Sequence, residues 1–291
     1  MNRVVREMLD RYALQGAGDY ENALREIFQE IALLGLWRSN LFEHAAFYGG
    51  TALRILHGLD RFSEDMDFSL LSASGKFHLG SYCQFIQREL SAWGFSVRVE
   101  VKQKTQESAV ESAFLKADTL SQMLLIEAPA DIANKIHRNQ LLRIKIEVDT
   151  NPPGFFKTET RYLLMPVPFA VRTYSLPSLF AGKLHALLFR KWQNRVKGRD
   201  WYDLIWYAAK GIPVNLSHLT ERMRQTGHWR QENNISVENL AELLTERIAS
   251  LNVDAARADI QSFIPRPHDV DIWSTDFFMQ LIEKIRCVDA E

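Results

Sequence analysis

Two aspartates separated by a single residue stand in a stretch where every second side chain is apolar, from Asp65 to Leu70. This period of two predicts a β-strand with one buried face. Asp65 and Asp67 then share the opposite face, where two carboxylates repel each other unless solvent or a cation compensates. Magnesium is usually held by one or two carboxylates together with substrate phosphates. The stretch therefore indicates a metal site, with a solvated strand face as the alternative interpretation.

A later stretch, residues 143–149, alternates in the same way and carries Lys145, Glu147 and Asp149 on one face. If this strand pairs beside the first, it supplies a third carboxylate. Three carboxylates around two metal ions suit in-line phosphoryl or nucleotidyl transfer, because the metals clamp the attacking and leaving oxygens. An edge strand with a polar outer face would show the same pattern.

Upstream of the paired aspartates lies a tight turn, Gly49-Gly50-Thr51. We expect Thr51 to cap a short helix that Gly58 ends. Backbone N–H groups at a helix start can hold phosphate, and glycine allows the phosphate to approach closely. Many helices begin after glycine, so the turn alone does not identify a phosphate site.

The second half of the chain has a helix bearing Lys183, followed by a basic run with no acid before Asp200. Such a run suits phosphate or an RNA backbone, although a solvated helix could carry it too. Asp200 and Asp203 are three residues apart and lie on one side of a helix, where they could also serve as an N-terminal cap and a partner for Arg199. The basic run comprises Arg190, Lys191, Arg195, Lys197 and Arg199.

These residues need a scaffold of both strands and helices. Helical spacing predicts helices over residues 20–37 and 78–93, and alternation predicts strands over 95–101 and 143–149. After Pro177 the apolar residues recur at helix spacing. We therefore predict an α/β fold with a mixed sheet in residues 1–175 and a mainly helical domain in residues 176–291, with the active site in the cleft that the second domain completes.

Composition narrows the class of protein. The net charge of -1 over 291 residues excludes a uniformly basic nucleic-acid binder but allows a local basic patch. The two cysteines, Cys83 and Cys287, have no metal-ligand spacing and give no support to a disulfide framework. The first residues lack the apolar run of a signal peptide, and no stretch is apolar enough to cross a bilayer. We expect a cytoplasmic protein without a membrane partner.

The segment centred on YGGTALRILHGLDRFSEDMDFSL, within residues 47–71, resembles the first motif of AbiEii-type toxins of the DNA polymerase β-like nucleotidyltransferase superfamily, to which MenT toxins are related. That motif is a glycine-rich turn with a hydroxyl residue, a helix, and D-x-D on a strand. PSLFAGKLHALLFRKWQNRVKGRDWYDLIW, residues 177–206, resembles the family's lysine-bearing helix and R-D-x-Y-D-L segment. The two stretches keep the family's order. The last 80 or so residues match no motif.

The resemblance implies a nucleotidyltransferase-type sheet core and assigns roles residue by residue. The glycine turn, from Gly49 and Gly50 to Thr51, would contact a nucleoside triphosphate, and Lys183 would neutralise its phosphate charge. Either Asp200 or Asp203 would complete the catalytic set. The metal ligands, for Mg²⁺ or Mn²⁺, would be Asp65, Asp67 and Glu147, with Asp149 as the alternative to Glu147.

Family members are bacterial toxins encoded beside a cognate antitoxin, and some relatives add nucleotides to tRNA. The resemblance therefore implies transfer of a nucleotide to an RNA acceptor such as tRNA. Two alternatives keep the fold. In one the acceptor is a small molecule or a protein, and in the other the chain is a non-catalytic module that binds nucleotide or RNA.

Overall fold

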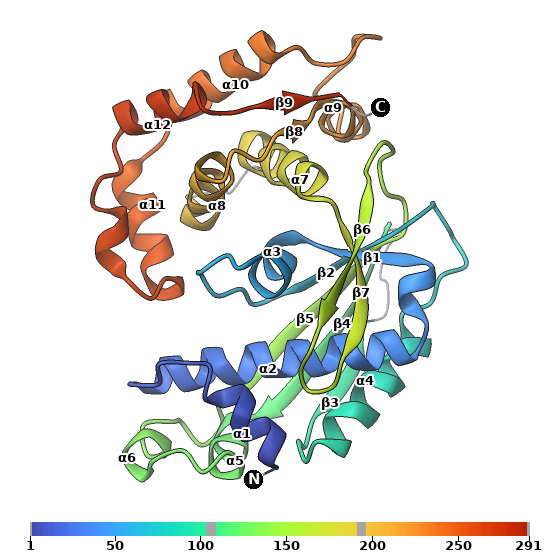
Figure 1. Ribbon diagram of the computed structural model, residues 1–291, viewed down its shortest axis with the longest axis vertical. Helices are drawn as coiled ribbons and strands as arrows, with labels where there is room; N and C mark the ends of the chain where they lie inside the picture. The colour runs from blue at the N-terminus through green and yellow to red at the C-terminus, as the bar shows by residue number, and fades with distance from the viewer. Residues whose placement is uncertain (1, 103–108, 191–195, 290–291) are drawn as a thin grey trace. The chain divides into compact units, whose positions relative to one another are not determined.

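The computed structural model describes residues 2–102, 109–190 and 196–289, which form two compact units (Figure 1). The first unit takes in Met1–Gly58, Phe62–Pro152 and Thr160–Thr173. The second begins at Tyr174, continues to Glu291, and also includes the short segments Leu59–Arg61 and Pro153–Glu159. Each unit is described by itself below.

The first unit is built on a mixed sheet with the strand order β3-β4-β5-β2-β1-β7-β6. Strand β2 runs parallel to β5 and antiparallel to β1, while β1 and β7 are parallel. The mixed α/β class predicted from sequence is therefore confirmed. The strands are β1 (Ala45–Tyr48), β2 (Met66–Leu70), β3 (Arg98–Val101), β4 (Val110–Asp118), β5 (Leu141–Asp149), β6 (Thr158–Leu163) and β7 (Phe169–Tyr174).

The two central strands that carry the acids bury their apolar face, as their alternation predicted. Met66 and Phe68 of β2 are completely buried, and so are Ile144, Ile146 and Val148 of β5. Burial of these side chains is the main force that holds both strands in the sheet, at about 25 cal/mol for each Å² of apolar surface removed from water. The acidic residues of both strands consequently lie on the other face.

Helices of the first unit pack around this sheet. The long helix α2 packs against α4 and β5 (Figure 1). A Cβ atom on Gly35 of α2 would lie 2.9 Å from the backbone of Ile86, so only glycine allows so close a crossing. The helices are α1 (Arg3–Leu9), α2 (Ala17–Arg38), α3 (Gly49–His57), α4 (Gly80–Ala92), α5 (Thr119–Leu125) and α6 (Ala130–Ala133).

Helix α3 begins earlier than the sequence indicated. It begins at Gly49 rather than after Thr51, and Tyr48 occupies the N-cap position without a side-chain cap. The prediction that Thr51 caps this helix is therefore wrong. The prediction that Gly58 ends it is confirmed, because Gly58 has the left-handed conformation, with φ of 74°, that glycine adopts most easily.

The second unit is mainly helical, as predicted. Its small parallel sheet joins β8 (Val214–Asn215) to β9 (Cys287–Val288), strands too short to show a period in the sequence. The helices are α7 (Leu176–Phe189), α8 (Gly198–Ala209), α9 (Leu216–Gln225), α10 (Val237–Ala249), α11 (Val253–Ile260) and α12 (Thr275–Ile282). Across the ranges that the structure describes, no helix combines the length and apolarity needed to cross a membrane.

Candidate active site

The pairing of β2 with β5 brings two of the predicted metal ligands side by side. Asp67 lies directly opposite Glu147, and Ser69 lies opposite Asp149. Residues opposite each other in neighbouring strands project to the same face of a sheet. Glu147 is therefore the acid of β5 that stands next to Asp67, whereas Asp149 accepts a hydrogen bond from the backbone N–H of Asn151 at 2.9 Å.

Glu147 is anchored from two sides. Its carboxylate forms an ion pair with Lys145 of the same strand, with 2.8 Å between Nζ and Oε1. The hydroxyl of Ser112, on the neighbouring strand β4, lies 3.4 Å from the same oxygen. The side chain is still 30% exposed, so one face of the carboxylate remains available to a ligand. Lys145 offsets part of the repulsion between Glu147 and Asp67.

The glycine turn lies against the carboxylate of Asp67. Tyr48, the residue before the turn, is opposite Asp67 in the antiparallel pair of β1 and β2. Gly49 has φ of 82°, and a Cβ atom added to it would overlap the Asp67 carboxylate. Only glycine meets both conditions. The turn and the aspartate are thus one local structure, and Gly50 follows Gly49 in the first turn of α3.

Two buried side chains hold the segment that leads into the acidic strand. The side-chain amide of Gln29, on α2, donates to the carbonyl oxygens of Ser63 and Glu64, each at 3.1 Å. The hydroxyl of Thr51 donates to the carbonyl oxygen of Asp65. Because Gln29 and Thr51 are buried, these donors have no water to bond instead. They fix the backbone from which Asp65 and Asp67 project.

This arrangement limits what Thr51 can offer a phosphate. Its side chain is completely buried and its hydroxyl is used by the backbone. The predicted contact of Thr51 with a nucleotide can therefore be met only by its backbone N–H. Gln29 was not found by sequence reasoning, because a glutamine inside an amphipathic helix carries no signal of the loop that it binds.

The donor set of this face fits a hard divalent cation. Asp67 and Glu147 are adjacent oxygen donors, and Asp65 is exposed just before the strand begins. Within the ranges described, no group of three or more His, Cys, Asp and Glu side chains converges closely enough to hold a metal ion. Mg²⁺ needs only one or two carboxylates when substrate phosphates and water complete its shell.

The residues predicted in the second unit form a buried ion-pair network. Nζ of Lys183 on α7 lies 2.9 Å from Oδ1 of Asp200 and 2.7 Å from Oδ2 of Asp203, both on α8. Asp203 also accepts two hydrogen bonds of 2.6 Å from the guanidinium of Arg61. The side chains of Arg61 and Asp203 are 2% and 0% exposed.

Arg61 is the member of this network that sequence reasoning missed. It lies in the short segment Leu59–Arg61 that belongs to the second unit, four residues before Asp65 in the chain. The neighbouring Asp60 accepts a hydrogen bond of 2.7 Å from the hydroxyl of Tyr202 on α8. An arginine in a loop shows no periodicity, so only its proximity to the D-x-D motif could have drawn attention to it.

The opposite charges of the network keep one another ionised. Burial alone would raise the pKa of Asp203, but Arg61 and Lys183 outweigh it and hold the pKa below its ordinary value. Burial also opposes the charge of Lys183, yet Asp200 and Asp203 raise its pKa. All of these groups are consequently ionised at neutral pH. The alternative roles considered for the acids, a helix cap and a partner for Arg199, are not what the structure shows.

The basic run is described only in part. Lys191 and Arg195 lie outside the described residues. Arg190 is exposed just after α7 and Lys197 occupies the N-cap position of α8. Burial lowers the pKa of Lys197 to about 8; the carboxylate of Asp200 opposes this shift, and the neighbouring cations add to it.

A sheet face with adjacent carboxylates beside a glycine turn is an arrangement suited to metal-assisted transfer of phosphoryl or nucleotidyl groups. The family model described as nucleotidyl transferase AbiEii toxin, type IV TA system, matches residues 31–280, which include all the predicted site residues. The chain belongs to this family of nucleotidyltransferase toxins. The resemblance noted in the two sequence motifs is confirmed.

Solved structures with a similar course of the chain come from Helicobacter pylori. JHP933 is 16% identical, with a TM-score of 0.48 over 90% of this chain and 88% of that chain. A second structure, provisionally described as a nucleotidyltransferase, is 18% identical, with a TM-score of 0.47 over 89% of each chain. Likenesses this low say nothing about shared activity. No curated protein matches the chain.

Proposed function

We propose that this nucleotidyltransferase moves a nucleotide from a nucleoside triphosphate to an RNA acceptor, with tRNA as the expected class, in a reaction that depends on Mg²⁺ or Mn²⁺. The observation that carries the proposal is the register of Asp67 with Glu147 beside the Gly49 turn. Both substrates are cytoplasmic, so the proposed site of action is the cytoplasm. A cognate antitoxin is the partner that the family description supports.

Each residue of this sheet face has a proposed role in nucleotide transfer. Asp67 and Glu147 would hold the cation, with Asp65 as the further carboxylate, and the backbone N–H groups of the glycine turn would receive phosphate oxygens. When bound, a divalent cation there lowers the charge on the reacting phosphate. A hydroxyl of the acceptor attacks the α-phosphorus, a new P–O bond forms, pyrophosphate leaves, and the proton of the hydroxyl passes to water.

Lys183 retains its proposed role toward phosphate in a restricted form. An ammonium group has three donors, and the carboxylates of Asp200 and Asp203 take two of them. One donor is left for a phosphate oxygen. The proposed part of Asp200 and Asp203 is to keep this ammonium charged and oriented.

The test is incubation of the purified chain with total RNA and each α-³²P-labelled triphosphate, with Mg²⁺ or with a chelator. We expect label on RNA that requires the metal. Asp67→Asn and Glu147→Gln should each reduce incorporation at least 100-fold, in line with loss of a charge that acts in the transition state. Asp149→Asn is the matched control on the same strand face and should retain activity.

Other outcomes separate the alternatives. Loss of activity in Asp149→Asn but not in Glu147→Gln would show that Asp149, and not Glu147, acts as the third carboxylate. Label on protein or on a small molecule would replace the RNA acceptor, while tight nucleotide binding without incorporation would leave a binding module. Unchanged incorporation by Asp67→Asn would refute the site.

A further inference from the structure

Positive charge gathers on the strand that carries Glu147 and on the loop before it. Between Asp131 and Glu147 the chain has four lysine or arginine residues and no acid, although its net charge is -1. Lys135 and Arg138 are exposed in the loop that joins α6 to β5. Arg143 is exposed on β5 and shares a face with Glu147, because the two residues are an even number of positions apart in one strand.

The register of the sheet extends this charge across two further strands. Lys116 of β4 lies opposite Arg143, and Arg98 of β3 lies opposite Lys116. Residues opposite each other project to the same face, so the three cations form a row across β5, β4 and β3, which lie side by side (Figure 1). This row and the two loop cations, Lys135 and Arg138, together form what we call the basic strip.

The acids near the basic strip are already engaged. Glu100 of β3 forms an ion pair with Lys116. Asp118, at the end of β4, caps α5 by accepting a hydrogen bond of 2.8 Å from the backbone N–H of Ser121. Within the ranges that the structure describes, no carboxylate forms an ion pair with any of the other four cations of the strip. Their charge can therefore attract an anionic ligand.

An aromatic ring lies between the basic strip and the proposed catalytic carboxylates. Phe114 of β4 is opposite Lys145 of β5, and this row of the sheet lies between the rows of Arg143 and Glu147. The Phe114 side chain is half-buried and faces away from the hydrophobic core. A solvated sheet face has no use for a phenyl group, whereas aromatic rings on the sheets of RNA-binding domains stack against unpaired bases.

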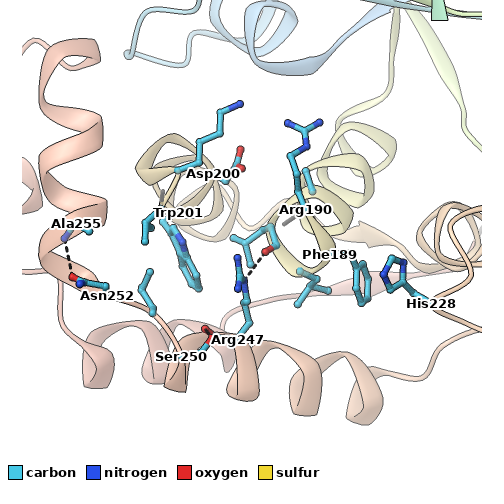
Figure 2. A pocket seen from close by; sticks show the side chains of 15 residues that line it. Phe189, Arg190, Asp200, Trp201, His228, Arg247, Ser250, Asn252 and Ala255 are labelled. Carbon is cyan, nitrogen blue, oxygen red and sulfur yellow. Dashed lines mark hydrogen bonds between the residues drawn. The ribbon is translucent and has the colours of Figure 1, made fainter. Parts of the chain in front are cut away.

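The described cations of the second unit have a different setting. Arg190 lines a pocket of about 670 Å³ together with Asp200 and Trp201 (Figure 2). A concave pocket of this size suits a small ligand. The backbone of a nucleic acid instead needs an extended surface, because its phosphates follow one another along the strand. The basic strip is such a surface.

We propose that the basic strip binds the phosphate backbone of a polymeric RNA acceptor upstream of its reacting end, while Phe114 stacks against one of its bases. The inference rests on the proposed function and adds a requirement for acceptor length. The four residues from Glu147 to Arg143 span about 13 Å of the strand. Successive phosphates of one strand in a B-form helix are about 3.4 Å apart along the axis, so the strip begins roughly four nucleotides from the reacting end. A dinucleotide does not reach it.

Equilibrium binding tests the basic strip without any need for turnover. Labelled single-stranded RNA and a labelled dinucleotide are titrated over a series of salt concentrations. The variant Arg98→Gln/Arg138→Gln/Arg143→Gln removes three exposed cations. Each phosphate contact with a single strand contributes about 0.7 to the slope of log affinity against log salt, so the slope for RNA should decrease by about 2. Between about 50 and 200 mM salt, the wild type should therefore lose roughly 20-fold more affinity than the variant.

The matched control is Arg3→Gln/Lys76→Gln/Arg88→Gln, which removes the same charge from exposed positions elsewhere in the first unit. It should leave the salt slope unchanged, because exposed charges beyond the Debye length are screened.

Phe114→Leu tests the stacking contact separately, because it keeps an apolar side chain and every charge. Loss of one stacked base should lower RNA affinity roughly 5- to 150-fold at every salt concentration and leave the slope unchanged. In the transfer assay, the triple variant of the strip should raise the KM for RNA and leave the KM for the triphosphate as it is.

The outcomes distinguish the strip from the proposed function. An equal salt slope in the triple variant and the wild type, or equal affinity of the wild type for RNA and the dinucleotide, would overturn the strip. Binding of poly-glutamate as tight as that of RNA would assign the surface to an acidic protein and would also overturn it. Incorporation of label by the triple variant with an unchanged KM for RNA would refute the strip and leave the proposed function standing. RNA binding that depends on the strip, in a chain that incorporates no label, would refute the proposed function alone.

Discussion

Replacement of Arg61 by methionine probes the buried network of the second unit. In the wild type, Arg61 donates two bonds of 2.6 Å to Asp203, and neither side chain is more than 2% exposed. Methionine keeps most of the side-chain volume but removes the charge and both bonds. Asp203 then keeps only the ion pair with Lys183, which Asp200 also uses.

The size of the expected stability loss follows from the burial of the Arg61–Asp203 pair. Solvent cannot screen this pair, so the small values of surface ion pairs do not apply. Removal of one partner from a buried pair typically costs about 3–5 kcal/mol, because the other charge is left without compensation. We therefore expect the free energy of unfolding of the second unit to decrease by about this amount. Arg3→Met is the control, since the Arg3–Glu7 pair is on the surface and should contribute almost nothing.

The assay is chemical denaturation of the full chain, completed as a double-mutant cycle. The variant Arg61→Met/Asp203→Leu removes both charges and leaves Lys183 paired with Asp200, so it should be more stable than Arg61→Met alone. A loss below about 1 kcal/mol in Arg61→Met, or losses in the two single variants that simply add in the double variant, would refute a coupled buried network.

The other predictions concern the first unit and the response to acid. Gly49→Ala should abolish nucleotide transfer because its Cβ atom overlaps Asp67. Gly58 has a similar positive φ but open space around it, so Gly58→Ala should lose stability and keep activity. Equal activity of the two variants in the incorporation assay would contradict this prediction. Gln29→Met removes the side-chain donor of two half-buried carbonyls and should cost about 1–3 kcal/mol together with a lowered kcat. The exposed Gln84→Met should change neither in denaturation and steady-state assays. Because folding lowers the pKa of Asp200 and Asp203, the stability they contribute is complete above about pH 4 and is lost as the pH falls through their folded values. Denaturation at decreasing pH should show this loss of unfolding free energy, and the loss should be smaller in Arg61→Met/Asp203→Leu. An equal loss in the two proteins would show that other groups cause the pH dependence.

The sequence was sufficient for features that depend on neighbours along the chain. The alternation around Asp67 and Glu147 predicted two strands with one buried face, because the period of a strand places its acids and its apolar residues on opposite sides. Helix spacing predicted the helices of the second unit, and the combination of strands and helices predicted the mixed α/β class. These patterns of apolar and polar residues follow from the geometry of a single strand or helix and from which of its faces is buried.

Tertiary structure decided which distant residues meet. The choice between Glu147 and Asp149 as the neighbour of Asp67 depends on the register of β2 against β5, and a shift of two residues would reverse it with no change in either strand's pattern. The partners of Lys183 and the burial of Arg61 depend in the same way on the packing of α7, α8 and a loop from much earlier in the chain. A buried charge is satisfied by whichever opposite charge the fold brings near it, and that partner is set by packing rather than by position in the sequence.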